Sequence, residues 1–484
     1  MGEVFHPWTR RLLAALSLLA LATPAHAAIP KAERSALEAF YKGTGGPKWS
    51  NRAGWLGKAG TECAWSGVSC NPARTTVVGL SLNDRGLTGS LPASLAKLPG
   101  LQFLELEGNA LTGALPKDLG KLANLRTLRL GLNLLSGALP KELGNLAKLE
   151  TLSLPFNRIP GALPPELGRL ASLRVLDLSR NAIAGAIPPQ LGNLVGLRLL
   201  DLSANRLNGG IPLDLGRLTG LTTLFLSSNQ LSGPIPRALG SLRALQQMSL
   251  SDNQLSGRIP PELGNLTKMM FLDLQGNQLS GVVPAKLGDA TSLIALVLSK
   301  NRLGGNIPGA FLNLANLEYL WLDRNLFTGP VPFEVGALFL LADGNGLDLR
   351  SNALATDTEP GLLADLNTKQ AGGDWRASQA AAAAFDRTLP LTGLADRRAG
   401  KFVYWTVDVA AGAKPLTVTT EAGTGNADLY VRFGAPPTLS LTDAVSAGSA
   451  NQESVTVAAP RVGRYYIGVY AKSPYSGVNL RVGG

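Results

Sequence analysis

A single pattern of hydrophobic and polar positions recurs through most of the 484-residue chain, with a period of 24 residues. Each period reads Leu-x-x-Leu-x-Leu-x-x-Asn-x-Leu-x-Gly-x-(Ile/Leu/Val)-Pro, as residues 197–212 illustrate. The alternation in x-Leu-x-Leu predicts a short strand whose leucines point inward and whose intervening residues point outward. The Gly and Pro that follow predict a reversal of the chain.

The asparagine of each period is predicted to lie in the bend after the strand, where its amide can satisfy backbone groups of its own and of the adjacent turn. This expected asparagine ladder consists of Asn109, Asn133, Asn157, Asn181, Asn205, Asn229, Asn253, Asn277, Asn301 and Asn325. Because no turn can bury its leucines alone, successive turns must stack. We therefore expect a solenoid of about 12 turns over residues 77–354, with a parallel β-sheet along one side.

These motifs resemble the leucine-rich repeat family, and the Leu-x-Gly-x-Ile-Pro segment resembles its plant-type subclass. The resemblance implies an α/β-type leucine-rich repeat solenoid whose parallel β-sheet forms a concave face, and it implies that this face binds the partner. The flanks look like the caps of that family. Residues 28–76 begin with an amphipathic helix at Glu33–Tyr41, and residues 355–391 contain a short helix at Thr358–Lys369 followed by a linker.

Residues 1–27 have the three parts of a secretory signal peptide. Arg10 and Arg11 supply the positive charge, residues 12–22 form an apolar run, and Ala25-His26-Ala27 is a cleavage motif. The run is too short to span a bilayer comfortably, and no later segment reaches the length that a membrane-spanning helix needs. We therefore expect an exported protein, located in the periplasm, on the cell surface or in the medium.

The only two cysteines, Cys63 and Cys70, lie seven positions apart in the predicted N-terminal cap. In an exported chain two such cysteines are expected to form a disulfide. Together with Trp65 this disulfide would close the exposed end of the hydrophobic core, as open solenoid ends require.

The outward strand positions and the bends that follow them form the candidate binding face. They carry nine acidic and five basic residues, although the whole chain has a net charge of +11. The acidic residues are Asp84, Glu105, Glu107, Asp177, Asp201, Asp252, Asp273, Asp323 and Asp348, and the basic ones are Arg129, Arg180, Lys300, Arg324 and Arg350. Nucleic acid and other acidic polymers therefore fit this face poorly. Exposed aromatic residues are typical of binding hot spots, and Tyr319, Trp321 and Arg324 form the strongest cluster. The predicted binding residues are Phe103, Glu105, Glu107, Arg129, Phe156, Asp177, Arg180, Phe225, Phe271, Asp273, Tyr319, Trp321, Asp323 and Arg324.

From residue 392 the pattern changes to short alternating segments separated by Gly, Pro and Ser, which predicts a small all-β sandwich. The predicted strands are residues 401–409, 415–420, 427–433, 454–457, 464–470 and 477–482. The motifs Trp405-Thr-Val-Asp-Val and Ala427-Asp-Leu-Tyr-Val-Arg-Phe-Gly make residues 392–484 resemble the bacterial pre-peptidase C-terminal domain, an accessory module that usually follows a secreted peptidase.

Asp428 is the candidate ligand for calcium in this domain, with Glu453 as a further, more remote candidate, because calcium takes oxygen ligands. A calcium ion at Asp428 is the single metal, and the single cofactor, that the sequence suggests. The alternative for Asp428 is a purely structural role in stabilising a turn.

The two histidines, His6 and His26, both lie in the predicted signal peptide, so the chain after residue 27 contains none. Histidine is the most common general base and metal ligand, and its absence excludes Ser-His-Asp triads, Cys-His pairs and His-ligated metals. We identify no catalytic residue and expect a protein that is not an enzyme.

Three functions remain open. The first is a secreted recognition protein whose repeat face binds a protein partner, with the sandwich serving secretion or attachment. The second is a protein that binds cell-wall or anionic polysaccharide, or that inhibits an enzyme degrading such a polymer. The third is an accessory protein of a secreted hydrolase.

Overall fold

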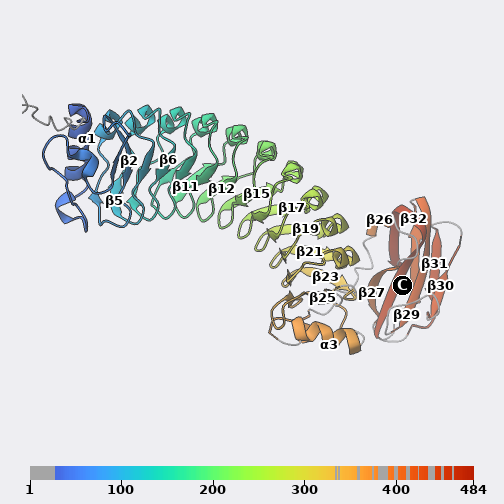
Figure 1. Cartoon of the computed structure of the whole chain (residues 1–484). Coiled ribbons are helices and arrows are strands. Elements are labelled where there is room, and N and C mark those ends of the chain that lie inside the picture. Colours follow the sequence, from blue (N-terminus) through green and yellow to red (C-terminus); the bar gives the residue numbers. More distant parts are fainter. Residues whose placement is uncertain are drawn as a thin grey trace, which may run out of the picture. The chain divides into compact units, whose positions relative to one another are not determined.

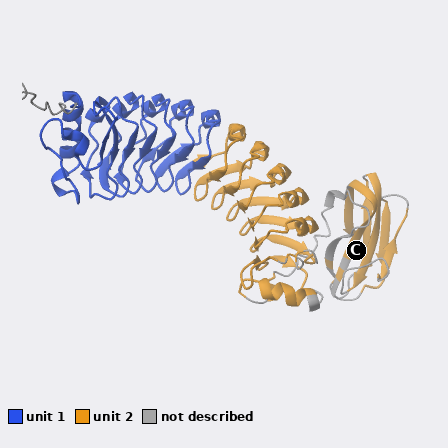
Figure 2. Ribbon diagram, viewed as in Figure 1, with its two compact units in different colours: residues 1–207 blue, residues 208–484 orange. Residues whose placement is uncertain are grey.

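The computed structural model describes residues 28–332, 335, 338, 340–356, 360–372, 375–379, 391–396, 402–409, 415–422, 424–433, 442–448, 452–460 and 463–483. The predicted signal peptide lies outside the described residues. The chain divides into two compact units, residues 1–207 and residues 208–484, which Figure 2 colours separately and which are described one at a time below.

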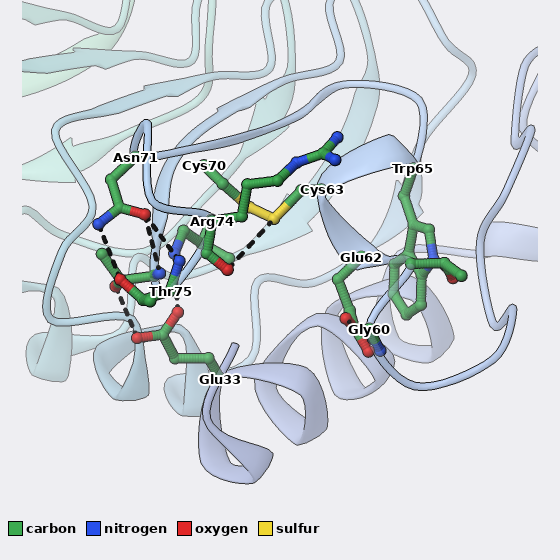
Figure 3. The surroundings of a disulfide bond; sticks show 12 residues. Glu33, Gly60, Glu62, Cys63, Trp65, Cys70, Asn71, Arg74 and Thr75 are labelled. Carbon is green, nitrogen blue, oxygen red and sulfur yellow. Dashed lines mark hydrogen bonds between the residues drawn. A yellow bond between two sulfur atoms is a disulfide. The ribbon is translucent and has the colours of Figure 1, made fainter. Parts of the chain in front are cut away.

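The first unit begins with a cap built around aromatic side chains. Its elements are α1 (Lys31–Gly43), η1 (Gly46–Lys48), η2 (Glu62–Ala64) and β1 (Val68–Cys70), which pairs antiparallel with β2 (Val77–Ser81). Trp55 packs against Trp49 and against Trp65, with ring centroids 5.0 Å apart in each pair, and all three side chains are buried. The predicted disulfide between Cys63 and Cys70 is present in this cap (Figure 3).

A buried carboxylate fastens the cap helix to the first strand of the repeats. Glu33 in α1 is 3% exposed, and it accepts hydrogen bonds from the backbone N–H of Val77 (2.8 Å) and from the hydroxyl of Thr76 (2.7 Å). Arg34 in the same helix forms an ion pair with Glu62. The cap is therefore joined to the repeats by polar contacts as well as by apolar packing.

The predicted parallel sheet is present in the repeats of both units (Figure 1). In the first unit its strands are β2, β4 (Phe103–Glu105), β6 (Thr127–Arg129), β8 (Thr151–Ser153), β10 (Val175–Asp177) and β12 (Leu199–Asp201). In the second unit they are β14 (Thr223–Phe225), β16 (Gln247–Ser249), β18 (Phe271–Asp273), β20 (Ala295–Val297), β22 (Tyr319–Trp321) and β24 (Leu347–Asp348). Within each unit neighbouring strands pair residues 24 positions apart, for example Leu128 with Leu152, except that β22 and β24 pair residues 27 apart, as Leu320 with Leu347. The inward leucines of these strands are fully buried.

Each turn also contributes a second short strand, which the sequence pattern did not predict. In the first unit these strands are β3 (Thr88–Gly89), β5 (Ala110–Gly113), β7 (Leu134–Leu135), β9 (Pro160–Gly161) and β11 (Ala182–Ala186). The next strand, β13 (Arg206–Gly209), spans the unit boundary. In the second unit they continue as β15 (Gln230–Pro234), β17 (Gln254–Gly257), β19 (Gln278–Val282), β21 (Arg302–Gly305), β23 (Leu326–Gly329) and β25 (Ala353–Leu354).

A 3-10 helix follows the Pro of most turns and returns the chain to the next strand. Pro fixes φ near −65°, which suits the start of such a helix, and Pro140 before η5 has φ −70°. In the first unit these helices are η3 (Ala93–Lys97), η4 (Lys117–Lys121), η5 (Lys141–Asn145), η6 (Pro165–Arg169) and η7 (Pro189–Asn193). In the second unit they are η8 (Leu213–Arg217), η9 (Arg237–Ser241), η10 (Pro261–Asn265), η11 (Ala285–Asp289) and η12 (Gly309–Asn313).

The asparagines of the repeat lie in the bends and hydrogen-bond to backbone groups of two turns. The amide of Asn133, for instance, donates to the carbonyl oxygens of Leu106 (2.9 Å) and Leu130 (3.1 Å). Its Oδ1 accepts from the N–H of Leu111 at 3.0 Å. Because Asn133 is 4% exposed, these bonds satisfy groups that water does not reach.

The C-terminal end of the repeats is closed by α3 (Pro360–Lys369) and η13 (Trp375–Ser378). Trp375 is fully buried. The side chain of Gln370 accepts a hydrogen bond from the N–H of Leu349 (3.1 Å), and that of Gln379 accepts one from the N–H of Leu354 (3.1 Å). Where the leucine pattern ends, glutamine side chains thus accept the backbone hydrogen bonds that asparagine side chains accept in the repeats.

The described part of the C-terminal region is antiparallel and all-β, with two layers around one core. Its strands are β26 (Leu391–Asp396), β27 (Phe402–Val409), β28 (Leu416–Glu421), β29 (Thr424–Phe433), β30 (Ala444–Ser446), β31 (Glu453–Val457) and β32 (Gly463–Gly483). Val418, Leu429, Ile467 and Leu480, among others, form the shared core.

The strand prediction was wrong at the end of the chain, where residues 464–470 and 477–482 belong to the single strand β32 and not to two. The first half of β32 pairs with β27 and β29, and its second half pairs with β26 and β28. Pro474 has no place in the ladder, because proline lacks the N–H that pairing requires. The pairing with β29 is irregular beside it, at Ser473 and Ser476. The strand therefore passes from one layer to the other without ending.

Candidate interaction surface

The structure places the predicted binding residues at two kinds of position, which together we call the sheet face. The first is the outward strand position, occupied by Phe103, Glu105, Arg129, Asp177, Phe225, Phe271, Asp273, Tyr319 and Trp321. The second is the segment between a strand and its asparagine, occupied by Glu107, Phe156, Arg180, Asp323 and Arg324. The first unit carries Phe103 to Arg180 and the second unit carries Phe225 to Arg324.

Several residues just before the asparagines have left-handed backbone conformations. Phe156 and Arg180 both have φ 53°, and Leu132 has φ 54°. Residues at the same position of other turns, such as Ala204 and Ser228, have the same conformation, so it belongs to the repeat. Leu132 and Phe156 are 57% and 48% exposed, and the Arg180 guanidinium lies 4.8 Å from the centre of the Phe156 ring. Exposure to water does not favour large apolar side chains, so their presence here is consistent with a role in recognition.

Two carboxylates lie side by side on the sheet face of the first unit. Asp177 and Asp201 are register partners in β10 and β12, and each accepts hydrogen bonds from the serine two residues later. Burial raises the pKa of the Asp201 carboxyl, hydrogen bonds from Ser203 oppose the rise, and the charge of Asp177 adds to it. A positively charged partner group would relieve this repulsion.

The sheet face of the second unit contains a shallow pocket of about 210 Å³. Its lining includes Phe271, Asp273, Gln275, Ala295, Val297 and Trp321. The indole N–H of Trp321 donates to the backbone carbonyl of Asn345 at 2.8 Å, which fixes the ring. Tyr319 contacts the same indole edge-on, with ring centroids 6.3 Å apart. Sequence reasoning identified the aromatic residues but missed Ala295, Val297 and Asn345.

One acidic residue assigned to the exposed face is instead part of the interior. Asp348 is 6% exposed, and its carboxylate binds the guanidinium of Arg350 at 2.6 Å. Gln370 also donates to Asp348 at 3.2 Å. Both charges of this pair are therefore engaged within the C-terminal end of the repeats, and the charge count of the sheet face loses one acidic and one basic group.

The candidate calcium ligand of the C-terminal region, Asp428, is 3% exposed in β29. Among the described residues, its Oδ1 and the Oδ1 of Asn426 are buried without a hydrogen-bond partner. Burial raises the pKa of the Asp428 carboxyl, the charge of Lys472 opposes the rise, and the charge of Glu453 adds to it. Asn426 and Glu453 both bond to backbone groups of Gly448. Two buried oxygens without partners, those of Asn426 and Asp428, thus occur in this strand. No group of three or more His, Cys, Asp or Glu side chains that could hold a metal ion is found in the described part of the chain.

Comparisons with known proteins match the two regions separately. Residues 164–281 match a leucine-rich repeat region, residues 266–327 match the leucine rich repeat, and residues 402–471 match the bacterial pre-peptidase C-terminal domain. Within the part of the chain that the structure describes, no helix has the length and apolar character needed to cross a membrane.

Relatives of the C-terminal region include proteases, which match this region alone. Alkaline serine exoprotease A of Vibrio alginolyticus is 43% identical over 93 residues, which are 19% of this chain and 17% of that protein. The extracellular protease of Xanthomonas campestris pv. campestris is 46% identical over 92 residues, or 19% of this chain and 16% of that protein. The chain thus spans less than a fifth of the length of either protease.

The repeats are similar to the ectodomains of plant receptors. The solved structure of the plant peptide hormone receptor RGFR1 in complex with RGF2 shares 37% identity, with a TM-score of 0.55, over 56% of this chain and 43% of the receptor. Both regions therefore match known families, and the chain contains leucine-rich repeat regions followed by a bacterial pre-peptidase C-terminal domain.

Proposed function

We propose that this protein is a secreted, non-catalytic recognition protein, and that the sheet face of its repeats binds a polypeptide partner. The observation that carries the proposal is the fixed aromatic group at Tyr319 and Trp321, which stands beside a preformed pocket on the sheet face. Aromatic side chains held rigid at a surface lose little entropy on binding and are enriched in hot spots. The similar receptor RGFR1 was solved with RGF2 bound and is described as a peptide hormone receptor, which supports a peptide or protein ligand.

Export is supported by the C-terminal region, whose relatives include a protease named as extracellular. The disulfide between Cys63 and Cys70 also suits an oxidising compartment. We propose that the signal peptide at residues 1–27 directs export and that the C-terminal domain serves secretion or attachment.

Replacing Tyr319 and Trp321 together with alanine is expected to weaken binding of a peptide ligand by about 30-fold or more, the usual loss for a hot spot. Short random peptides displayed on phage supply the ligands, selected on the full exported chain. Their affinities for the wild type and for the double variant are then compared by fluorescence anisotropy.

The matched control is Leu213→Ala, which removes another large exposed side chain from the same unit but lies in η8, away from the sheet strands. Its peptide affinities should equal those of the wild type. Failure to select peptides, or selected peptides that bind the Tyr319→Ala/Trp321→Ala variant undiminished, contradicts polypeptide recognition by this face. Binding to pectate that disappears at moderate salt would favour the polysaccharide alternative instead.

For the C-terminal domain we propose a calcium ion held by Asp428, with Asn426 and Glu453 nearby. Calcium takes oxygen ligands, and the buried unpartnered oxygens of Asn426 and Asp428 fit that requirement. The ion would neutralise a carboxylate that burial otherwise makes costly to ionise.

Asp428→Asn is expected to stabilise the calcium-free protein at neutral pH by about 1 kcal/mol. The pKa of Asp428 is raised in the folded chain, so the folded chain binds this proton more tightly than the unfolded chain does. The free energy of unfolding therefore falls as the pH rises from about 3.9, the pKa of an aspartate in the unfolded chain, through the raised pKa of the folded chain. Calorimetry in chelator at low and neutral pH should show this loss in the wild type and not in the variant.

Calcium chloride should raise the Tm of the wild type and leave that of Asp428→Asn unchanged. Glu421→Gln is the control in the same domain, because Glu421 forms an exposed ion pair with Arg481 and contributes little. An unchanged wild-type Tm in calcium would remove the proposed site.

A further inference from the structure

The pocket in the second unit exists because one small residue lies between two large ones. Across β18, β20 and β22, Phe271 pairs with Ala295 and Ala295 with Tyr319. Two residues later, Asp273 pairs with Val297 and Val297 with Trp321. The short side chains of Ala295 and Val297 therefore form a floor, and Phe271 and Trp321 stand on either side of it.

The walls of this pocket are in place before any ligand arrives. Trp321 is held by its hydrogen bond to the carbonyl of Asn345 and by the edge of Tyr319. Phe271 is 39% exposed, so its ring offers a face to solvent. A preformed apolar site loses little conformational entropy on binding. The volume of about 210 Å³ is below the roughly 300–1,000 Å³ of cofactor-sized sites, so one side chain is a suitable occupant.

Asp273 supplies a negative charge at this pocket. Its Oδ1 accepts from the N–H of Gln275 and its Oδ2 accepts from the hydroxyl of Ser249, both at 3.0 Å. A carboxylate has about four acceptor positions, so each oxygen can accept another bond. No ion pair to Asp273 is present among the residues that the structure describes. At the neighbouring bend, Arg324 already faces Asp323 at 3.8 Å.

An apolar floor, aromatic walls and a free carboxylate together select for a side chain with an apolar stem and a cationic head. Aromatic faces attract ammonium and guanidinium groups, and a carboxylate forms charge-assisted hydrogen bonds with them. The aliphatic parts of lysine and arginine cover apolar surface while their charged ends reach polar groups. An acidic side chain would be repelled by Asp273, and a purely apolar one would take water from the carboxylate without supplying a countercharge.

We propose that this pocket receives a lysine or arginine side chain of the partner polypeptide. The proposal rests on the proposed function, since it names the chemistry of the ligand that the same face binds. The charge requirement rests on Asp273, because Asp323 on the same sheet face already faces Arg324. The partner segment therefore contributes one cationic side chain as its anchor.

The test uses phage-displayed random peptides selected on the full chain. Peptides whose binding depends on Tyr319 and Trp321 should share a lysine or arginine at one position. Asp273→Asn preserves the shape of the side chain and removes its charge, and it should weaken these peptides about tenfold. Replacing the shared basic residue with norleucine should cause the same loss, and the two changes together should cost little more than either alone.

Asp252→Asn is the matched control, because it removes an exposed carboxylate of the same unit that does not line the pocket. It should leave the affinities unchanged. Peptides that need Tyr319 and Trp321 but lack a shared basic residue, or that bind the Asp273→Asn variant as tightly as the wild type, overturn this inference and leave the proposed function standing. If no selected peptide depends on Tyr319 and Trp321, both are wrong.

Discussion

Replacing Asn133 with alanine is expected to lower the free energy of unfolding by about 2–4 kcal/mol, because it leaves several buried backbone groups without partners. The N–H of Leu111 loses its acceptor, and the carbonyl oxygens of Leu106 and Leu130 lose their donor. No water compensates, since Asn133 is 4% exposed. The loss exceeds that of one ordinary hydrogen bond because the amide serves two turns at once.

Asn145→Ala is the matched control for this substitution. Asn145 is the last residue of η5 in the following return segment, and it is exposed. Its replacement should change stability by less than about 0.5 kcal/mol, as is usual for surface positions. Urea unfolding monitored by circular dichroism measures both variants. If the Asn133→Ala and Asn145→Ala variants are equally stable, the asparagine ladder contributes little to the free energy of unfolding.

The fold of the repeats was predictable because each turn contacts only its neighbours. A period of 24 residues in the sequence is the same as the register of the strands, so that Leu128 pairs with Leu152 without any long-range information. The outward positions follow from the same alternation. The sequence therefore located Phe271, Asp273, Tyr319 and Trp321 on one face before any coordinates were considered.

The pocket was not predicted, because it depends on a position where the side chain is small. A search for large or charged residues passes over Ala295, although this residue creates the space between Phe271 and Tyr319. The support of Trp321 by Asn345 was also hidden, since it uses a backbone carbonyl. Tabulating small residues at outward positions, and not large ones alone, would have revealed the gap.

The C-terminal strands were harder to delimit than the repeats. Residues 471–476 look like a turn because they include Ser473 and Pro474, but β32 runs through them. Local composition favours a break, whereas pairing with β29 on one side and with β28 on the other keeps the segment extended. Tertiary pairing overrides local preference in such cases.

Replacing Cys63 and Cys70 with serine is expected to lower the stability of the N-terminal cap by about 2–3 kcal/mol, the entropic effect of opening a short loop in the unfolded chain. The disulfide closes a loop that carries Trp65 and begins directly after Glu62 (Figure 3). Glu62 in turn pairs with Arg34 of the cap helix. Without the disulfide the tryptophan packing and this ion pair must be held by weaker contacts.

The loss should be confined to one end of the molecule, because the stability of a repeat array is a sum of local and nearest-neighbour contributions. Hydrogen exchange measured by mass spectrometry should therefore be faster than in the wild type in residues 31–81. This acceleration should become smaller toward β6, and β18 and β20 should exchange as in the wild type. A reducing agent supplies the control, since it should reproduce this pattern in the wild type and change nothing in the double serine variant. Uniform acceleration along the whole chain would contradict local coupling, and it would show that the cap and the repeats unfold as one cooperative unit.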